Sequence, residues 1–220
     1  HSSFVANKLG LETLILLSDD NCCSMQSLEK ETFEFFKKVA GYDTLRLILC
    51  KKSILVEGDS DELVVQRAYM DTHEGRLPIQ DGIDVMTVGG VTFKRYLEIA
   101  QTLNKETAVV TDNDGNIESV KKKYKEYEKT PCIHICVDEV VDTGDLKLSD
   151  KDFNYNTLEP KILKENGRDV MNKIFGTNYD TDDEMHKYMY THKTDCAIAI
   201  FESATKIKYP EYIMRAIKNE

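Results

Sequence analysis

The chain has 220 residues, of which 41% are hydrophobic and 31% charged, and its formal net charge is −10. Since no apolar run approaches the roughly 18 residues that a membrane helix needs, the sequence predicts a globular protein without a transmembrane segment. The negative charge argues against broad nonspecific affinity for nucleic acid, although acids that cluster around metal ions would still allow a local site.

The residues before the main sheet are predicted to form short helices and strands. The chain opens with His1 rather than Met and has no signal-peptide pattern, so we expect a cytoplasmic fragment of a longer protein. Whether His1 is native or a tag remnant stays open. The expected elements are a short helix at 1–9, a strand at 11–17, a polar loop at 19–27, and helices at 29–40 and 43–50.

Strands and helices then alternate. The expected strands are 54–56, 83–88, 107–111 and 132–137, and the expected helices are 60–72, 92–103 and 117–129. Strands separated by helices of about 10–15 residues predict a parallel sheet with right-handed crossovers.

After residue 137 the pattern changes to all-helical. An acidic, turn-rich segment at 138–156 precedes five helical patterns. These span residues 159–164, 170–175, 183–190, 195–204 and 210–217. We therefore expect three parts, which span residues 1–52, 53–140 and 141–220.

The six cysteines contain no C-x-x-C pair. Cys132 and Cys136 flank an Ile-His-Ile strand, so a zinc site with His134 is one alternative. Reduced thiols in the core of a cytosolic protein are the favoured interpretation.

Acids follow two of the predicted strands. Glu57 and Asp61 come after the strand at 54–56, and Asp112 and Asp114 come after the strand at 107–111. Open α/β sheets place their ligands at the carboxyl ends of the strands. Several carboxylates share such a volume only if a cation joins them, which predicts an oxygen-ligated Mg²⁺ or Mn²⁺ site.

Two other interpretations of the Asp-Asn-Asp-Gly-Asn string are disfavoured. An EF-hand loop that began at Asp112 would need Gly at its sixth position and Glu at its twelfth, where this chain has Ile117 and Lys123. A haloacid-dehalogenase-like phosphatase would use Gly144-Asp145 and Asp150 as its late acidic motif. However, too few residues separate these positions from Asp112 for the cap and the other motifs of that family.

The order of the motifs resembles a Toprim domain, in which one strand ends in Glu-Gly and a later strand ends in Asp-x-Asp. Here these are Glu57-Gly58 and Asp112-Asn113-Asp114, with Gly89-Gly90 ending the strand between them. The chain also contains Leu-Val-Glu-Gly-x-Ser-Asp at 55–61, Val-Gly-Gly-Val-Thr-Phe at 88–93, Thr-Leu-Glu at 157–159 and Lys-Thr-Asp-Cys-Ala at 193–197. These motifs resemble the OLD (overcoming lysogenization defect) nuclease family.

This resemblance implies an α/β, Toprim-type parallel sheet flanked by helices, with a C-terminal helical subdomain that completes the active site. It implies a DNA endonuclease or nickase of phage defence that uses two divalent ions about 4 Å apart. The implied metal ligands are Glu57, Asp61, Asp112, Asp114 and Glu159, and the implied catalytic residues are Glu57, as a proton shuttle, and Lys193, as a source of positive charge. Asp61 departs from the family, whose members often carry Glu there.

The resemblance also extends to the start of the chain. His1-Ser2-Ser3 resembles the end of the ATPase that precedes the Toprim part in this family, so 1–52 would be the end of that ATPase and a connecting segment. ATP would bind only in the missing ATPase, and full-length protein would form homo-oligomers through regions outside this chain.

Alternative functions stay open. One is a non-catalytic Toprim module that binds metal and DNA, and another is a topoisomerase- or primase-like enzyme. We expect Asp59 and Glu62 to be solvated acids at a helix start rather than ligands. We expect the lysine cluster at 121–125 to lie on a solvated helix face.

Overall fold

The computed structural model describes residues 15–18, 21–38, 43–89, 92–148, 151–152 and 154–218. The predicted helix at 1–9 and the start of the predicted strand at 11–17 lie outside these residues. β1 (Ile15–Ser18) pairs antiparallel with β2 (Asn21–Ser24), so the loop prediction for 19–27 is wrong at β2. The Asn-Cys-Cys-Ser sequence does not alternate apolar and polar residues, so only the backbone pairing with β1 identifies it as a strand.

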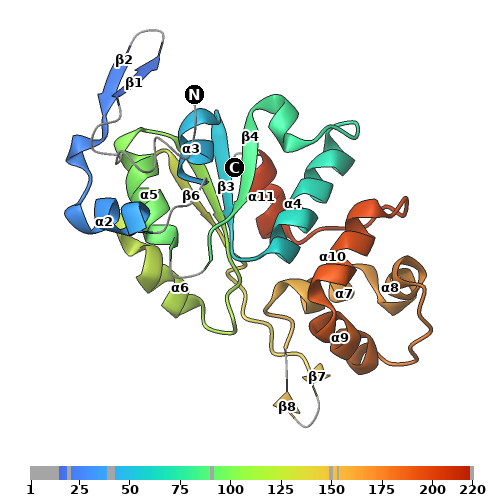
Figure 1. Ribbon diagram of the computed structural model, residues 1–220. Coiled ribbons are helices and arrows are strands. Elements are labelled where there is room, and N and C mark those ends of the chain that lie inside the picture. The colour runs from blue at the N-terminus through green and yellow to red at the C-terminus, as the bar shows by residue number, and fades with distance from the viewer. Residues whose placement is uncertain are drawn as a thin grey trace.

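A four-stranded parallel sheet with the order β4-β3-β5-β6 forms the centre of the molecule (Figure 1). Its strands are β3 (Lys52–Val56), β4 (Ile83–Thr87), β5 (Glu106–Val110) and β6 (Ile133–Cys136). β3 is buried along its whole length, as expected for a central strand covered on both faces. The predicted sheet is therefore confirmed.

Helices cover both faces of the sheet. On one face, α4 (Asp59–Thr72) and α11 (Glu211–Lys218) share a core with Ile54 and Val56 of β3. On the other face, Leu55 belongs to a second core. Its helices are α2 (Lys30–Lys38), α3 (Asp43–Leu49), α5 (Phe93–Thr102) and α6 (Ile117–Tyr124). Alternate side chains of one strand thus enter different cores.

The chain reverses its winding direction between β3 and β5. α4 connects β3 to β4 across one face, and α5 connects β4 to β5 across the other, so that β5 lies on the opposite side of β3 from β4. The carboxyl ends of β3 and β5 therefore flank a topological switch point, which is where open α/β sheets form their ligand crevice.

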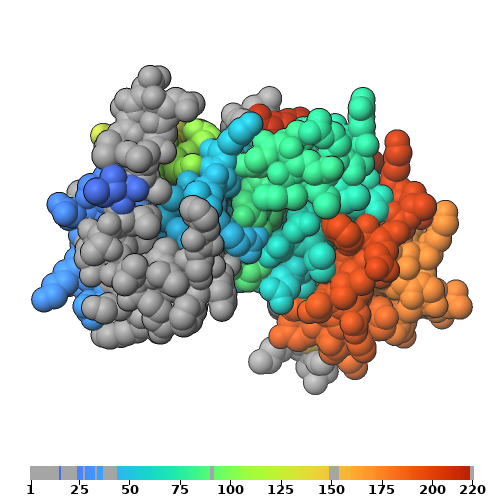
Figure 2. Space-filling view, turned by 45° about the horizontal axis from the view of Figure 1, so that its top comes forward, coloured from blue at the N-terminus to red at the C-terminus, as the bar shows by residue number. Residues whose placement is uncertain are grey.

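The remaining helices lie beside one end of the sheet, next to α4 (Figure 1). They are α7 (Leu158–Asn166), α8 (Arg168–Phe175), α9 (Asp182–Thr191) and α10 (Lys193–Glu202). α10 packs along α4, and the two helices adjoin on the surface in Figure 2. α11 then returns to the sheet and packs on β5 and β6. The turn-rich segment contains a small hairpin of β7 (Lys147–Leu148) and β8 (Lys151–Asp152).

The described residues bear on the predictions about cysteines, zinc and membrane helices. Cys50, Cys132, Cys136 and Cys196 are buried free thiols, as expected for core cysteines. His134 Nε2 lies 2.6 Å from Glu106 Oε1, and the described residues contain no group of side chains spaced for zinc. No described helix is both long and apolar enough to cross a bilayer.

Candidate metal centre

A cavity of about 390 Å³ opens at the carboxyl ends of β3 and β5. The side chains around it come from four separate segments of the chain. They are Glu57, Asp59, Ser60 and Asp61, then Asp112 and Asp114, then Thr157, Leu158 and Glu159, and finally Lys193 and Thr194, with Gly58 completing the wall. All six residues predicted for the site thus line one cavity.

Glu57 enters the cavity directly from the end of β3. The register pairs Leu55 with Val109, so Glu57 comes beside Thr111, the residue after β5. The Thr111 hydroxyl donates a hydrogen bond of 2.7 Å to Glu57 Oε1. One carboxylate oxygen is therefore fixed, and the other is left for a ligand.

Asp61 lies in the first turn of α4. Its Oδ2 accepts a hydrogen bond of 3.0 Å from the Gly58 backbone N–H, which orients the carboxyl at the helix start. Burial raises the pKa of the Asp61 carboxyl to about 7, and the charges of Glu159 and Glu57 add to this increase. The cavity is thus crowded with negative charge.

Asp112 is held by two donors from two helices. The Leu158 backbone N–H, at the start of α7, donates to Oδ2 over 3.1 Å, and the Tyr212 hydroxyl of α11 donates to Oδ1 over 3.1 Å. Burial raises the pKa of Asp112 well above its usual range, and the neighbouring Asp61 charge raises it further. Each oxygen retains a lone pair for a further partner.

The two acids of the Asp-x-Asp string have different surroundings, and the asparagine between them is a brace for the end of β5. Asp114 is exposed at the cavity and has a left-handed backbone, with φ of 47°. Between the two acids, Asn113 is buried, and its amide donates to the backbone carbonyls of Asp138 (2.9 Å) and Val140 (3.0 Å). Asn113 therefore ties the end of β5 to the segment after β6.

Glu159 and Lys193 form an ion pair, with 3.2 Å between Glu159 Oε1 and Lys193 Nζ. Glu159 is buried in the first turn of α7, whereas Lys193, the first residue of α10, is exposed and lies 5.3 Å from the ring centre of Tyr190. The C-terminal helices thus add one acid and one cation to the four acids that follow β3 and β5.

The donor chemistry fits a hard divalent cation, although the described residues contain no three side chains already spaced as a metal site. The acids at the cavity offer oxygen donors only, which suit Mg²⁺ or Mn²⁺. Burial is the main cause of the raised pKa values of Asp61 and Asp112, and the charges of neighbouring acids add to it, so a bound cation would favour the ionised carboxylates.

Other acids near the cavity have different surroundings. Glu62 is half-buried, and its two oxygens accept hydrogen bonds from Gln66 (3.1 Å) and Thr87 (3.0 Å), so it braces α4 against β4 rather than being solvated. Asp59 is exposed at the rim. Asp145, which a phosphatase would require at the site, does not line the cavity.

Sequence reasoning missed the residues that hold the carboxylates. The sequence predicts only a strand for Thr111 and only a C-terminal helix for Tyr212. Neither residue stands in a motif, and hydrogen bonds between distant segments leave no local signal in the sequence.

Comparisons with known proteins agree with the fold. Residues 48–114 match the family described as "Overcoming lysogenization defect protein-like, TOPRIM domain". Two structures of the C-terminal region of the OLD protein from Xanthomonas campestris pv. campestris resemble the chain at 18% identity and a TM-score of 0.52. They cover 79% and 77% of this chain and 93% of their own. The C-terminal region of the Burkholderia pseudomallei OLD protein aligns at 16% identity with a TM-score of 0.47, over 77% of this chain and 96% of its own. No curated protein sequence matches the chain.

Proposed function

We propose that this chain is the nuclease part of an OLD-family protein and hydrolyses DNA phosphodiesters with divalent metal, because residues 48–114 match the OLD-like TOPRIM domain. The observation that carries this proposal is the convergence of Glu57, Asp61, Asp112, Asp114, Glu159 and Lys193 on one cavity at the switch point of the sheet.

The proposed roles follow from the chemistry of each side chain. The five carboxylates hold Mg²⁺ or Mn²⁺, in a two-ion arrangement if all five serve as ligands. When bound, such ions supply a nucleophilic water and stabilise the leaving oxygen. Glu57 can also accept a proton from a water beside it, since Thr111 occupies only one of its oxygens.

Lys193 is proposed to neutralise charge on the phosphate during the reaction. Its ammonium lies at the rim of the acidic cavity, where a DNA strand would bring a phosphate. Charge placed in advance at the point where charge develops is an effective contribution to catalysis.

The organisation of the full protein is also a proposal. We infer that 1–52 connects to an ATPase that alone binds ATP, that 53–140 is the Toprim domain, and that 141–220 completes the active site. The protein would act in the cytoplasm in phage defence, as a homo-oligomer assembled through regions beyond this chain.

A plasmid-nicking assay with Mg²⁺, Mn²⁺, Ca²⁺ or EDTA tests the proposal. We expect conversion of supercoiled to nicked plasmid with Mg²⁺ or Mn²⁺ and none with EDTA. Metal binding without nicking would instead support the non-catalytic module, and strand passage or primer synthesis would support a topoisomerase- or primase-like enzyme.

A further inference from the structure

We propose that Tyr212 is a positioning residue of this site, whose hydroxyl holds the Asp112 carboxylate in the orientation that binds the divalent metal. The inference rests on the proposed function, in which Asp112 is a metal ligand. Tyr212 lies on α11, and 100 positions along the chain separate it from Asp112.

The contact is specific and enclosed. Tyr212 is 2% exposed, and its hydroxyl lies 3.1 Å from Asp112 Oδ1. The other oxygen of Asp112 accepts the Leu158 N–H. A carboxylate with one donor can turn about its Cβ–Cγ bond, whereas donors from two helices on its two oxygens fix its plane.

α11 is anchored so that Tyr212 has a fixed position. Ile213 and Ala216 of this helix are fully buried in the core against the sheet. The Lys52 ammonium of β3 donates to the Ala216 carbonyl over 2.6 Å, and the Arg215 guanidinium donates to the Val137 carbonyl after β6. The helix that carries the tyrosine is therefore tied to β3, the strand that Glu57 follows, and to the segment after β6.

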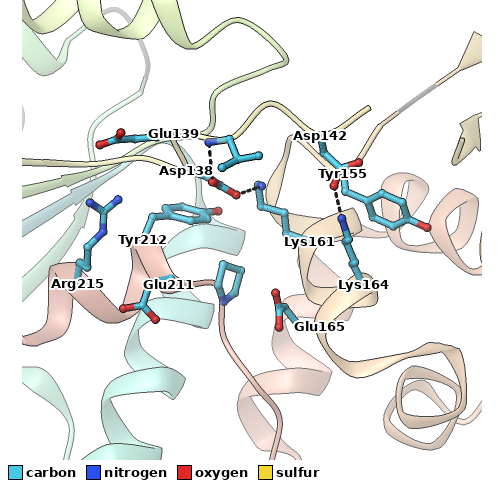
Figure 3. A pocket seen from close by; sticks show the side chains of 12 residues that line it. Asp138, Glu139, Asp142, Tyr155, Lys161, Lys164, Glu165, Glu211, Tyr212 and Arg215 are labelled. Atoms are coloured by element: carbon cyan, nitrogen blue, oxygen red, sulfur yellow. Dashed lines mark hydrogen bonds and ion pairs between the residues drawn. The ribbon is translucent and has the colours of Figure 1, made fainter. Parts of the chain in front are cut away.

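Tyr212 acts from behind the carboxylate and does not line the acidic cavity. It lines instead a second cavity of about 510 Å³ between α7, α11 and the segment after β6 (Figure 3). In that view the Tyr212 side chain lies near Asp138, which pairs with Lys161. Because Tyr212 does not face the cavity where substrate would bind, its effect on the reaction is indirect.

Tyr212→Phe tests this role, because it removes the hydroxyl and keeps the ring. Tyr209→Phe is the matched control: the Tyr209 hydroxyl also donates to a carboxylate, Asp71 Oδ2 at 2.6 Å, but outside the site. Titration calorimetry with Mn²⁺ should show affinity reduced about 10- to 100-fold in Tyr212→Phe, the range for partners that orient metal ligands, and within about twofold of wild type in Tyr209→Phe.

Nicking rates measured against Mn²⁺ concentration give a second readout. A positioning role predicts that Tyr212→Phe needs more Mn²⁺ but regains most of its rate at saturation, which a general loss of folded protein would not produce. Thermal unfolding in EDTA reports the stability of both variants, and if Tyr212→Phe does not fold, Tyr212→Met removes the same donor.

Equal Mn²⁺ affinity of Tyr212→Phe and wild type would overturn this inference and leave the proposed function standing. Absence of Mn²⁺ binding by wild type, or equal binding by wild type and Asp112→Ala, would refute the metal site itself and this inference with it.

Discussion

At the scale of single residues, substitution of Lys193, which pairs with Glu159, should lower the cleavage rate without lowering metal affinity. Lys193→Ala removes a cation but no oxygen donor, so we expect cleavage to fall on the order of 100- to 1000-fold while Mn²⁺ affinity is kept. Lys193→Arg should recover little, because a planar guanidinium does not replace a compact ammonium. Nicking rates and Mn²⁺ titrations on the same preparations are the measurement.

Lys187→Ala is the control for this variant, because Lys187 is an exposed lysine on the neighbouring helix α9. It should nick DNA at the wild-type rate. A near wild-type rate for Lys193→Ala would show that Lys193 has no part in the chemistry.

A second pair of variants compares two acids at the same cavity. Asp112 is held by donors from two helices, whereas Asp59 is exposed at the rim. Asp112→Ala should abolish both Mn²⁺ binding and cleavage, and Asp59→Ala should keep most of both. The opposite result in calorimetry and nicking assays would mean that the ligands are wrongly assigned.

The raised pKa of Asp61 predicts a pH-dependent stability without metal. Between its ordinary value of 3.8 and about 7, the folded protein holds a proton that the unfolded chain releases. This group therefore makes the free energy of unfolding decrease as pH rises through that window. Asp61→Asn should stabilise the protein in EDTA at pH 8, and the gain should disappear near pH 4. Urea unfolding at several pH values measures it, and a gain that is independent of pH would contradict the assignment.

The residues that could be predicted are those that stand in motifs. Glu57, Asp61, Asp112 and Asp114 follow predicted strands, and their meeting at one edge follows from the geometry of parallel sheets. Glu159 and Lys193 were expected only through resemblance to a family, since nothing local distinguishes them from surface residues. Their roles as ligands and catalyst stay predictions.

At the scale of elements, Asn113 is the brace between β5 and the segment after β6. Asn113→Ala leaves two backbone carbonyls without their donor, and we expect a loss of about 1–3 kcal/mol of stability. Because the brace lies between Asp112 and Asp114, Mn²⁺ affinity should also fall. Urea unfolding and calorimetry measure the two effects.

Asn166→Ala is a matched control, because the Asn166 amide also donates to two carbonyls, those of Ile162 and Lys208, away from the cavity. It should destabilise the protein without changing Mn²⁺ affinity. A loss of affinity in both variants would mean that affinity follows global stability and not the brace.

The long elements were predictable because their apolar residues repeat with a clear period. Each predicted strand and helix from residue 54 onward has a counterpart in the structure. The short strands β2, β7 and β8 are not predicted, because two to four residues are too few to show a period. The return of α11 to the sheet was also beyond prediction, since packing partners far apart in sequence are not encoded locally.

At the scale of the whole molecule, the net charge of −10 opposes the approach of DNA, which is itself a polyanion. Bound metal would cancel much of the negative charge at the acidic cavity, so DNA affinity should depend on metal. Fluorescence anisotropy with an uncleavable duplex should show binding at least about tenfold tighter in Mg²⁺ than in EDTA. Asp112→Ala should show no such difference, and equal affinity of wild type in both conditions would contradict the prediction.

The wide separation of the site residues along the chain has a consequence for biosynthesis. A nascent chain that has left the ribosome only as far as β6 presents Glu57 and Asp112, but not yet Glu159, Lys193 or Tyr212. Under the proposed function, such a partial product holds a fragment of a DNA-cutting centre that lacks its lysine and the tyrosine behind Asp112. Under that function, a chain interrupted after β6 would lack Glu159, Lys193 and Tyr212 and would be far less able to cut the DNA of the cell that makes it.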